Sequence, residues 1–124
     1  MKSKMLVGVV LLAWVTMGWV AHAERPDHFK GLPADTLEEA VKNFSEHNQQ
    51  LAALLDQGEL SAADIAAIHE LTYTLENALE KINAELTALA DTLEEVHVAS
   101  EIADGDTVLT KGREYLSTAR KVIE

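Results

Sequence analysis

The chain contains no cysteine among its 124 residues, and this absence excludes several classes of protein. Disulfide bonds, thiol nucleophiles and covalently attached haem all require cysteine, as does a lipid anchor on a processed N-terminus. Proline is almost as scarce, since Pro26 and Pro33 are the two in the chain. The sequence after residue 33 is therefore free of the residue that most often interrupts helices.

Methionine and tryptophan occur only within residues 1–19. The same region begins with Lys2 and Lys4, continues through a charge-free run over residues 5–20, and closes with Ala-His-Ala at 21–23. This order is typical of a secretory signal peptide, which would leave a processed protein that begins at Glu24. A retained membrane anchor is the alternative, but the apolar run is near the lower limit for spanning a bilayer.

Basic residues are also few, with 10 Lys and Arg against 21 Asp and Glu. All the acidic residues follow the leader, whereas Lys2 and Lys4 would leave with it. The processed chain would then carry eight basic residues and a net charge of −13. A charge of this sign repels phosphate groups, so we expect no nucleic-acid partner and no stable membrane association after cleavage of the leader.

Three helices are predicted after an extended segment at residues 24–34, within one helical domain at 35–124. Asp35 or Thr36, each with a glutamate three residues on, and Ser61 with Asp64 have the spacing of capping boxes, which satisfy the free amide groups at a helix start. Gly58 is suited to the left-handed conformation that ends a helix. The predicted helices span residues 36–56, 61–103 and 107–123.

An apolar stripe with a repeat close to 3.5 residues runs along the long central helix. Its members are Ile65, Ile68, Leu71, Leu75, Leu79, Ile82, Leu86, Leu89, Leu93 and Val96. The string ADTLEE occurs at 34–39, where it begins a helix, and again at 90–95, so a break near Asp91 is the alternative. Because the stripe keeps its phase across the second string, one continuous helix is favoured.

These elements predict an all-α fold: an antiparallel bundle of three helices with a long central helix, preceded by a signal-peptide helix. A four-helix bundle with a break near Asp91 is the alternative. Both connecting loops are short, so each outer helix would fold back along one end of the central one. Such a rod is two helices thick and leaves apolar surface exposed, so we expect a homodimer or a helical protein partner.

Histidine and glutamate are the residue types that could bind a metal cation in this chain. The candidates are His47, His69, His97, Glu46, Glu70 and Glu94. His69 and His97 would lie about 42 Å apart on a continuous helix, so they could not share an ion within one chain. Exposed surface histidines are the simpler interpretation.

No cofactor and no enzymatic activity are expected. Glu94-x-x-His97 matches half of a di-metal carboxylate motif, but the second half is missing. The chain has no Gly-x-Ser-x-Gly turn and no glycine-rich loop for phosphate. Thr72, Tyr73, Thr74 and Asn77 form a polar patch that is either ordinary surface or a contact for the extended N-terminal segment.

Three segments resemble a known protein family. They are RPDHF at 25–29, PADTLEEA at 33–40 and HELTYTLENAL at 69–79. The chain is similar through them to small secreted helical proteins of Gram-negative bacteria that are classed as a domain of unknown function. The resemblance implies a periplasmic location, and it implies no activity and no site residues.

The sequence thus favours a non-enzymatic, acidic, periplasmic helical protein that acts as a protein-interaction or structural module. Low-specificity binding or buffering of metal cations through His and Glu side chains is the alternative function.

Processing of the leader is directly testable. The protein recovered from the periplasm is expected to begin at Glu24, because Ala21 and Ala23 are small residues at the two positions that the signal peptidase reads. Fractionation followed by intact-mass measurement checks this expectation. Recovery of the uncut chain from the cytosol would contradict it.

Overall fold

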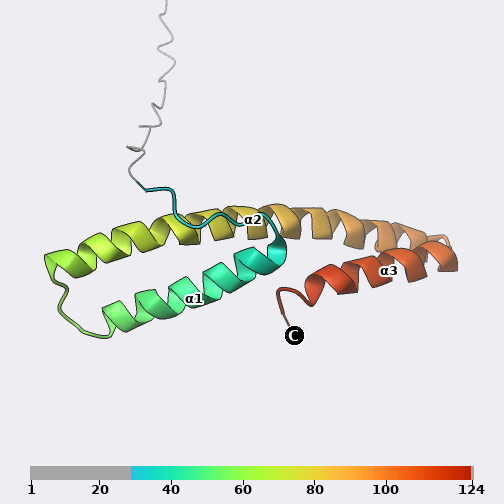
Figure 1. Ribbon diagram of the computed structural model, residues 1–124. Helices are drawn as coiled ribbons and strands as arrows, with labels where there is room; N and C mark the ends of the chain where they lie inside the picture. Colours follow the sequence, from blue (N-terminus) through green and yellow to red (C-terminus); the bar gives the residue numbers. More distant parts are fainter. Residues whose placement is uncertain (1–28, 124) are drawn as a thin grey trace, which may run out of the picture.

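A computed structural model describes residues 29–123, so the expected leader at 1–23 lies outside the described residues (Figure 1). These residues form three α-helices and no strand: α1 (Leu37–Leu55), α2 (Ala62–Glu101) and α3 (Gly105–Ala119). The all-α, three-helix prediction is confirmed. None of these helices combines the length and apolar character that crossing a membrane requires.

The long helix α2 is unbroken and is the partner of both other helices. It continues through Asp91 and is about 60 Å long at 1.5 Å per residue. The four-helix alternative with a break near Asp91 is therefore wrong. Helix α1 packs along the first half of α2 and α3 along the second half, both on the same side, so the structure is an elongated rod (Figure 1).

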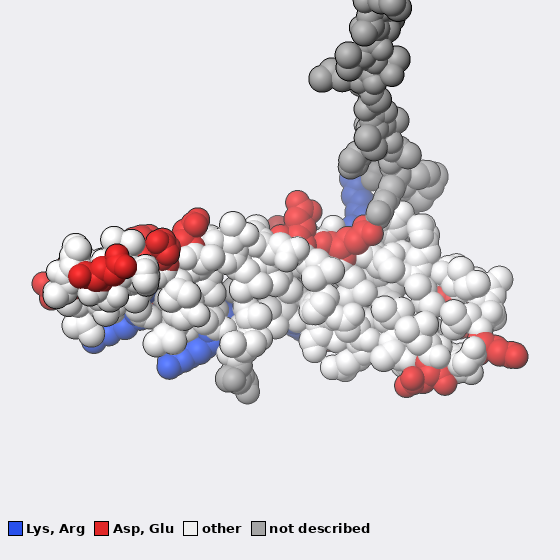
Figure 2. All heavy atoms as spheres, turned by 180° about the vertical axis from the view of Figure 1, so that it is seen from behind, with Lys and Arg blue, Asp and Glu red and all other residues white. Residues whose placement is uncertain are grey.

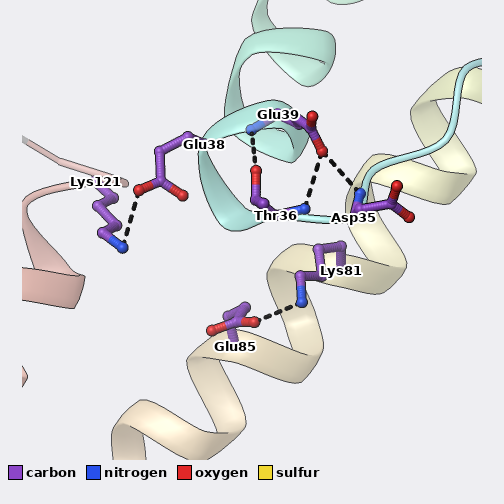
Figure 3. A network of polar contacts seen from close by, with 7 residues as sticks. All are labelled: Asp35, Thr36, Glu38, Glu39, Lys81, Glu85 and Lys121. Atoms are coloured by element: carbon purple, nitrogen blue, oxygen red, sulfur yellow. Dashed lines mark hydrogen bonds and ion pairs between the residues drawn. The ribbon is translucent and has the colours of Figure 1, made fainter.

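Each helix begins at a side chain that satisfies free backbone amides. Thr36 Oγ1 accepts from the Glu39 amide at 3.2 Å, and Glu39 Oε2 accepts from the Thr36 amide at 3.1 Å (Figure 3). Ser61 and Asp64 form the same reciprocal pair, so both predicted capping boxes are confirmed. Asp104 caps α3 by accepting from the Thr107 amide at 3.2 Å.

The hydrophobic core is small and lies near the middle of the rod. Leu37, Ala40, Ala78 and Ile82 are buried together, where α1 begins against α2. Val122, just beyond the end of α3, packs against the same cluster. The start of α1 and the residues after α3 therefore meet at one place on α2.

An ion pair joins α1 to the residues after α3 at this meeting point. Lys121 Nζ lies 2.9 Å from Glu38 Oε1 (Figure 3). The hydrogen bond from Lys121 holds the pKa of Glu38 below its usual value. Both side chains are largely exposed to solvent, so the pair positions the end of the chain more than it stabilises the fold.

The turn between α2 and α3 contains a strained alanine. Ala103 has φ of 57°, in the left-handed region that favours glycine. The Asp104 amide donates to the Ala99 carbonyl at 2.9 Å, and the Ala103 amide to the Ser100 carbonyl at 3.3 Å. These two bonds form a Schellman motif, in which the left-handed position is usually glycine.

Ala103→Gly is therefore expected to stabilise the protein by about 1 kcal/mol, because glycine adopts this backbone conformation without the steric cost of a Cβ atom. Thermal or urea unfolding monitored by circular dichroism measures the change. The matched control is Ala66→Gly at an exposed position inside α2, which should destabilise by about 1 kcal/mol. Equal destabilisation by both variants would contradict the left-handed turn.

Candidate functional site

The candidate metal ligands are spread along two helices. Glu46 and His47 lie on α1, whereas the other four candidates lie on α2, in two pairs near residues 69–70 and 94–97. Since α2 is continuous, the two pairs are about 36 Å apart. The structure does not bring the six candidates together.

Each candidate histidine has a local partner on its own helix. His47 Nδ1 lies 2.9 Å from the Asn43 carbonyl oxygen. His69 packs edge-on against Tyr73, with its Nε2 atom 3.4 Å from the Tyr73 hydroxyl. His97 Nε2 lies 3.4 Å from Glu101 Oε1. These are contacts one helical turn apart, typical of side chains on a solvated helix surface.

One hollow brings two of the candidates to the same surface. His47 of α1 and Glu70 of α2 line an open depression of about 290 Å³ beside Phe29 and Leu32. Two protein donors leave most of a metal's coordination sphere to water. Within residues 29–123 no group of three His, Asp or Glu side chains is placed to hold a metal ion.

The polar patch on α2 binds the N-terminal segment. The Leu32 amide donates to Thr74 Oγ1 at 2.9 Å, and Thr74 is 2% exposed. Asn77 Nδ2 donates to the carbonyl oxygens of Lys30 and Leu32, each at 2.9 Å. Of the two interpretations of this patch, contact with the extended segment is confirmed for Thr74 and Asn77. We call residues 29–34 the strap.

Gly31 allows the strap to lie directly on the backbone of α2. Its φ is +68°, and a Cβ atom built at this position would lie 2.6 Å from the Thr74 nitrogen and 2.7 Å from the Tyr73 carbonyl carbon. Any other residue would therefore face both conformational strain and a collision with helix backbone. The strap closes one flank of α2, and Phe29 at its start packs against the Tyr73 ring.

The opposite flank carries two rows of exposed apolar side chains. Leu79, Leu86 and Leu93 on α2 are 40–45% exposed. Leu109 and Leu116 on α3, with Ile123 beyond its end, are 45–70% exposed. Both rows have the seven-residue spacing of helices that pack along a left-handed seam. We call these six residues the leucine face.

Both rows lie on the same side of the α2–α3 pair. An ion pair at 3.1 Å joins Lys111 Nζ to Glu95 Oε2 and marks one flank. At 100° per residue, Leu93 lies about 160° around α2 from Glu95, and Leu109 lies about 160° around α3 from Lys111. Both rows therefore lie on the flank opposite this ion pair. Figure 2 shows this side as a broad band without charged side chains. Sequence reasoning placed the α2 row in the core and did not single out the α3 row.

The chain belongs to the family of unknown function DUF6746, whose family model matches residues 1–124. No curated protein and no solved structure matches the chain.

Gly31→Ala is expected to detach the strap and to destabilise the protein by about 2 kcal/mol, since hydrogen bonds to Thr74 and Asn77 would be lost. Hydrogen exchange at the Leu32 amide and tryptic cleavage after Lys30 report detachment, and both should become faster. Gly58→Ala is the matched control, because Gly58 also has positive φ but no neighbour within 4 Å. If only stability changed, equally in both variants, the close packing of the strap on α2 would be contradicted.

Proposed function

We propose that this member of the family acts as a non-enzymatic helical module of the bacterial periplasm, which binds another protein surface through its leucine face. The observation that carries the proposal is the pair of exposed apolar rows on α2 and α3. Single exposed leucines are common on protein surfaces, but six aligned on one side of two packed helices form a continuous patch. Patches of this kind mark sites of protein association.

The thinness of the rod supports the same function. Seven hydrophobic residues among those described are buried, and none of the large side chains is fully buried. A fold that is two helices thick covers each helix on one side, so its remaining apolar surface is available to a partner. Addition of further helices on this side would give the cross-section of a four-helix bundle.

The periplasmic location rests on the sequence of the leader. Residues 1–23 have the charged start, apolar run and small closing residues of a signal peptide. The absence of cysteine, and of methionine and tryptophan after the leader, fits an oxidising compartment, where these side chains are the most readily oxidised.

Metal-cation buffering has less support as the alternative function. His69 and His97 are far apart on α2, and each lies beside a side chain of its own helix. His47 and Glu70 are the two candidates that share a hollow, and they come from different helices. A low-affinity, water-rich site is the most that this pair could form alone.

Site-specific photo-crosslinking in living cells tests the interaction function. A benzoylphenylalanine at position 86 is expected to form an adduct of defined mass, because Leu86 is at the centre of the leucine face. The control position is Ala88, two residues further along α2 and exposed, but turned about 160° away from the row.

An adduct at position 86 and none at position 88 would support the proposal. The absence of an adduct at either position would contradict the interaction function.

A further inference from the structure

We propose that the partner on the leucine face is a second copy of this chain, packed about a twofold axis that runs parallel to the rod. This inference rests on the proposed interaction function and names the partner. In the dimer, α2 of one copy lies antiparallel against α3 of the other. The α2–α3 section of the rod then becomes a bundle of four helices in which every neighbouring pair is antiparallel.

The spacing of the two rows fits this arrangement. Leu79, Leu86 and Leu93 repeat every seven residues on α2, and Leu109 and Leu116 do so on α3, with Ile123 seven residues further on, beyond the end of the helix. Because α2 and α3 are antiparallel, a half-turn about the rod axis places each row opposite the other row of the second copy. Rows with the same repeat can then interdigitate as knobs into holes. The surface is self-complementary, as a twofold interface requires.

The charges that border the face select this axis. Glu80 and Glu94 each directly follow a leucine of the α2 row, and Arg113 and Arg120 follow the leucines of the α3 row by four residues. Figure 2 shows acidic side chains along the α2 edge of the uncharged band and basic side chains along the α3 edge. One face thus carries opposite charges on its two edges.

These bordering charges have no ion-pair partner among the residues that the structure describes. Within residues 29–123, neither arginine makes an ion pair, and neither do Glu80 and Glu94. The described lysines, in contrast, all have a contact of their own.

A half-turn about the rod axis brings the acidic edge of one copy to the basic edge of the other. An axis across the rod would instead place acidic edge against acidic edge, which repulsion disfavours.

The size of the face is sufficient for a specific but weak dimer. Since Lys111 lies level with Glu95, the two rows together span about 27 Å of the rod at 1.5 Å per residue. Two packed helices present a band about 20 Å wide. The interface would bury on the order of 1,100 Å² in total, near the lower limit of specific protein interfaces. We therefore expect a dimer with a dissociation constant in the micromolar range.

Sedimentation velocity of the purified protein over about 1–200 µM tests the dimer. The wild-type protein is expected to shift from monomer to dimer across this range. Leu86→Glu should raise the dissociation constant at least tenfold, because it places a carboxylate in the apolar interface. Ala88→Glu adds the same charge on the opposite flank of α2, at an exposed position, and should leave the dissociation constant within about threefold. Circular dichroism confirms that both variants remain helical, as expected for positions exposed in the monomer.

A charge exchange tests the orientation. Within one chain, the Lys111–Glu95 ion pair shows that these two residues lie level with each other on the antiparallel helices α3 and α2. Arg113 therefore lies level with residue 93 of α2. A half-turn about the rod axis keeps this level and places Arg113 of one copy near Glu94 of the other. Arg113→Glu should weaken the dimer, and adding Glu94→Arg to the same chain should restore it. Restoration supports the axis along the rod, and failure to restore overturns it.

A monomer at all concentrations would overturn the dimer, as would equal effects of Leu86→Glu and Ala88→Glu. If the protein is monomeric while position 86 still forms an adduct with a different protein in cells, the dimer fails and the proposed function stands. If no adduct forms at position 86 either, both proposals fail.

Discussion

The structure depends on one helix being the packing partner of both others. Helices α1 and α3 each bury one side against α2, at opposite halves of it. The hydrophobic core is consequently thin, and its central cluster lies where the start of α1 and the residues after α3 meet at Ala78 and Ile82. A break in α2 would remove the common support of both outer helices. The packing of both outer helices therefore depends on α2 being long and unbroken.

This constraint leaves the two flanks of the rod unlike one another. One flank is closed where the strap crosses α2, because Gly31 permits close approach and Thr74 and Asn77 satisfy the strap's backbone groups. The Lys111–Glu95 ion pair lies on the same flank, further along α2. The other flank carries the leucine face, with unpaired charges of opposite sign along its two edges. The asymmetry explains why one side of so small a protein is a candidate interface.

Much of the fold could be predicted from local sequence signals. The capping residues Thr36 and Ser61 start their helices as expected, since a capping box depends on side chains three residues apart and little else. The stripe on α2 was only partly interpreted correctly: Leu71, Leu75 and Ile82 are buried, whereas Leu79, Leu86 and Leu93 are exposed. Periodicity shows which apolar side chains share one side of a helix, but the number of helices packed on that side decides how many of them are buried.

Sequence reasoning offered the contact of the strap with Thr74 and Asn77 as one interpretation, but it missed the role of Gly31 and the left-handed Ala103 in the α2–α3 turn. Gly31 has a positive φ because it crosses the backbone of a helix about 40 residues further on, a contact that no local pattern encodes. Ala103 occupies the left-handed position that ends α2, and a glycine at this position would have indicated the end of the helix in the sequence. The second half of the leucine face did have a signal, the seven-residue spacing of Leu109, Leu116 and Ile123. A seven-residue spacing of apolar residues on α3 indicates an interface when these residues are not the ones that pack on α2.

The continuity of α2 is the central claim, and a distance between two spin labels tests it most directly. Because the chain has no cysteine, Ala63→Cys and Val98→Cys introduce a unique labelled pair at exposed positions near the two ends of α2. Double electron–electron resonance, with labelled protein diluted in unlabelled protein, should give about 52 Å for 35 residues of continuous helix. A main distance below about 40 Å would mean that the helix folds back on itself and would contradict the account.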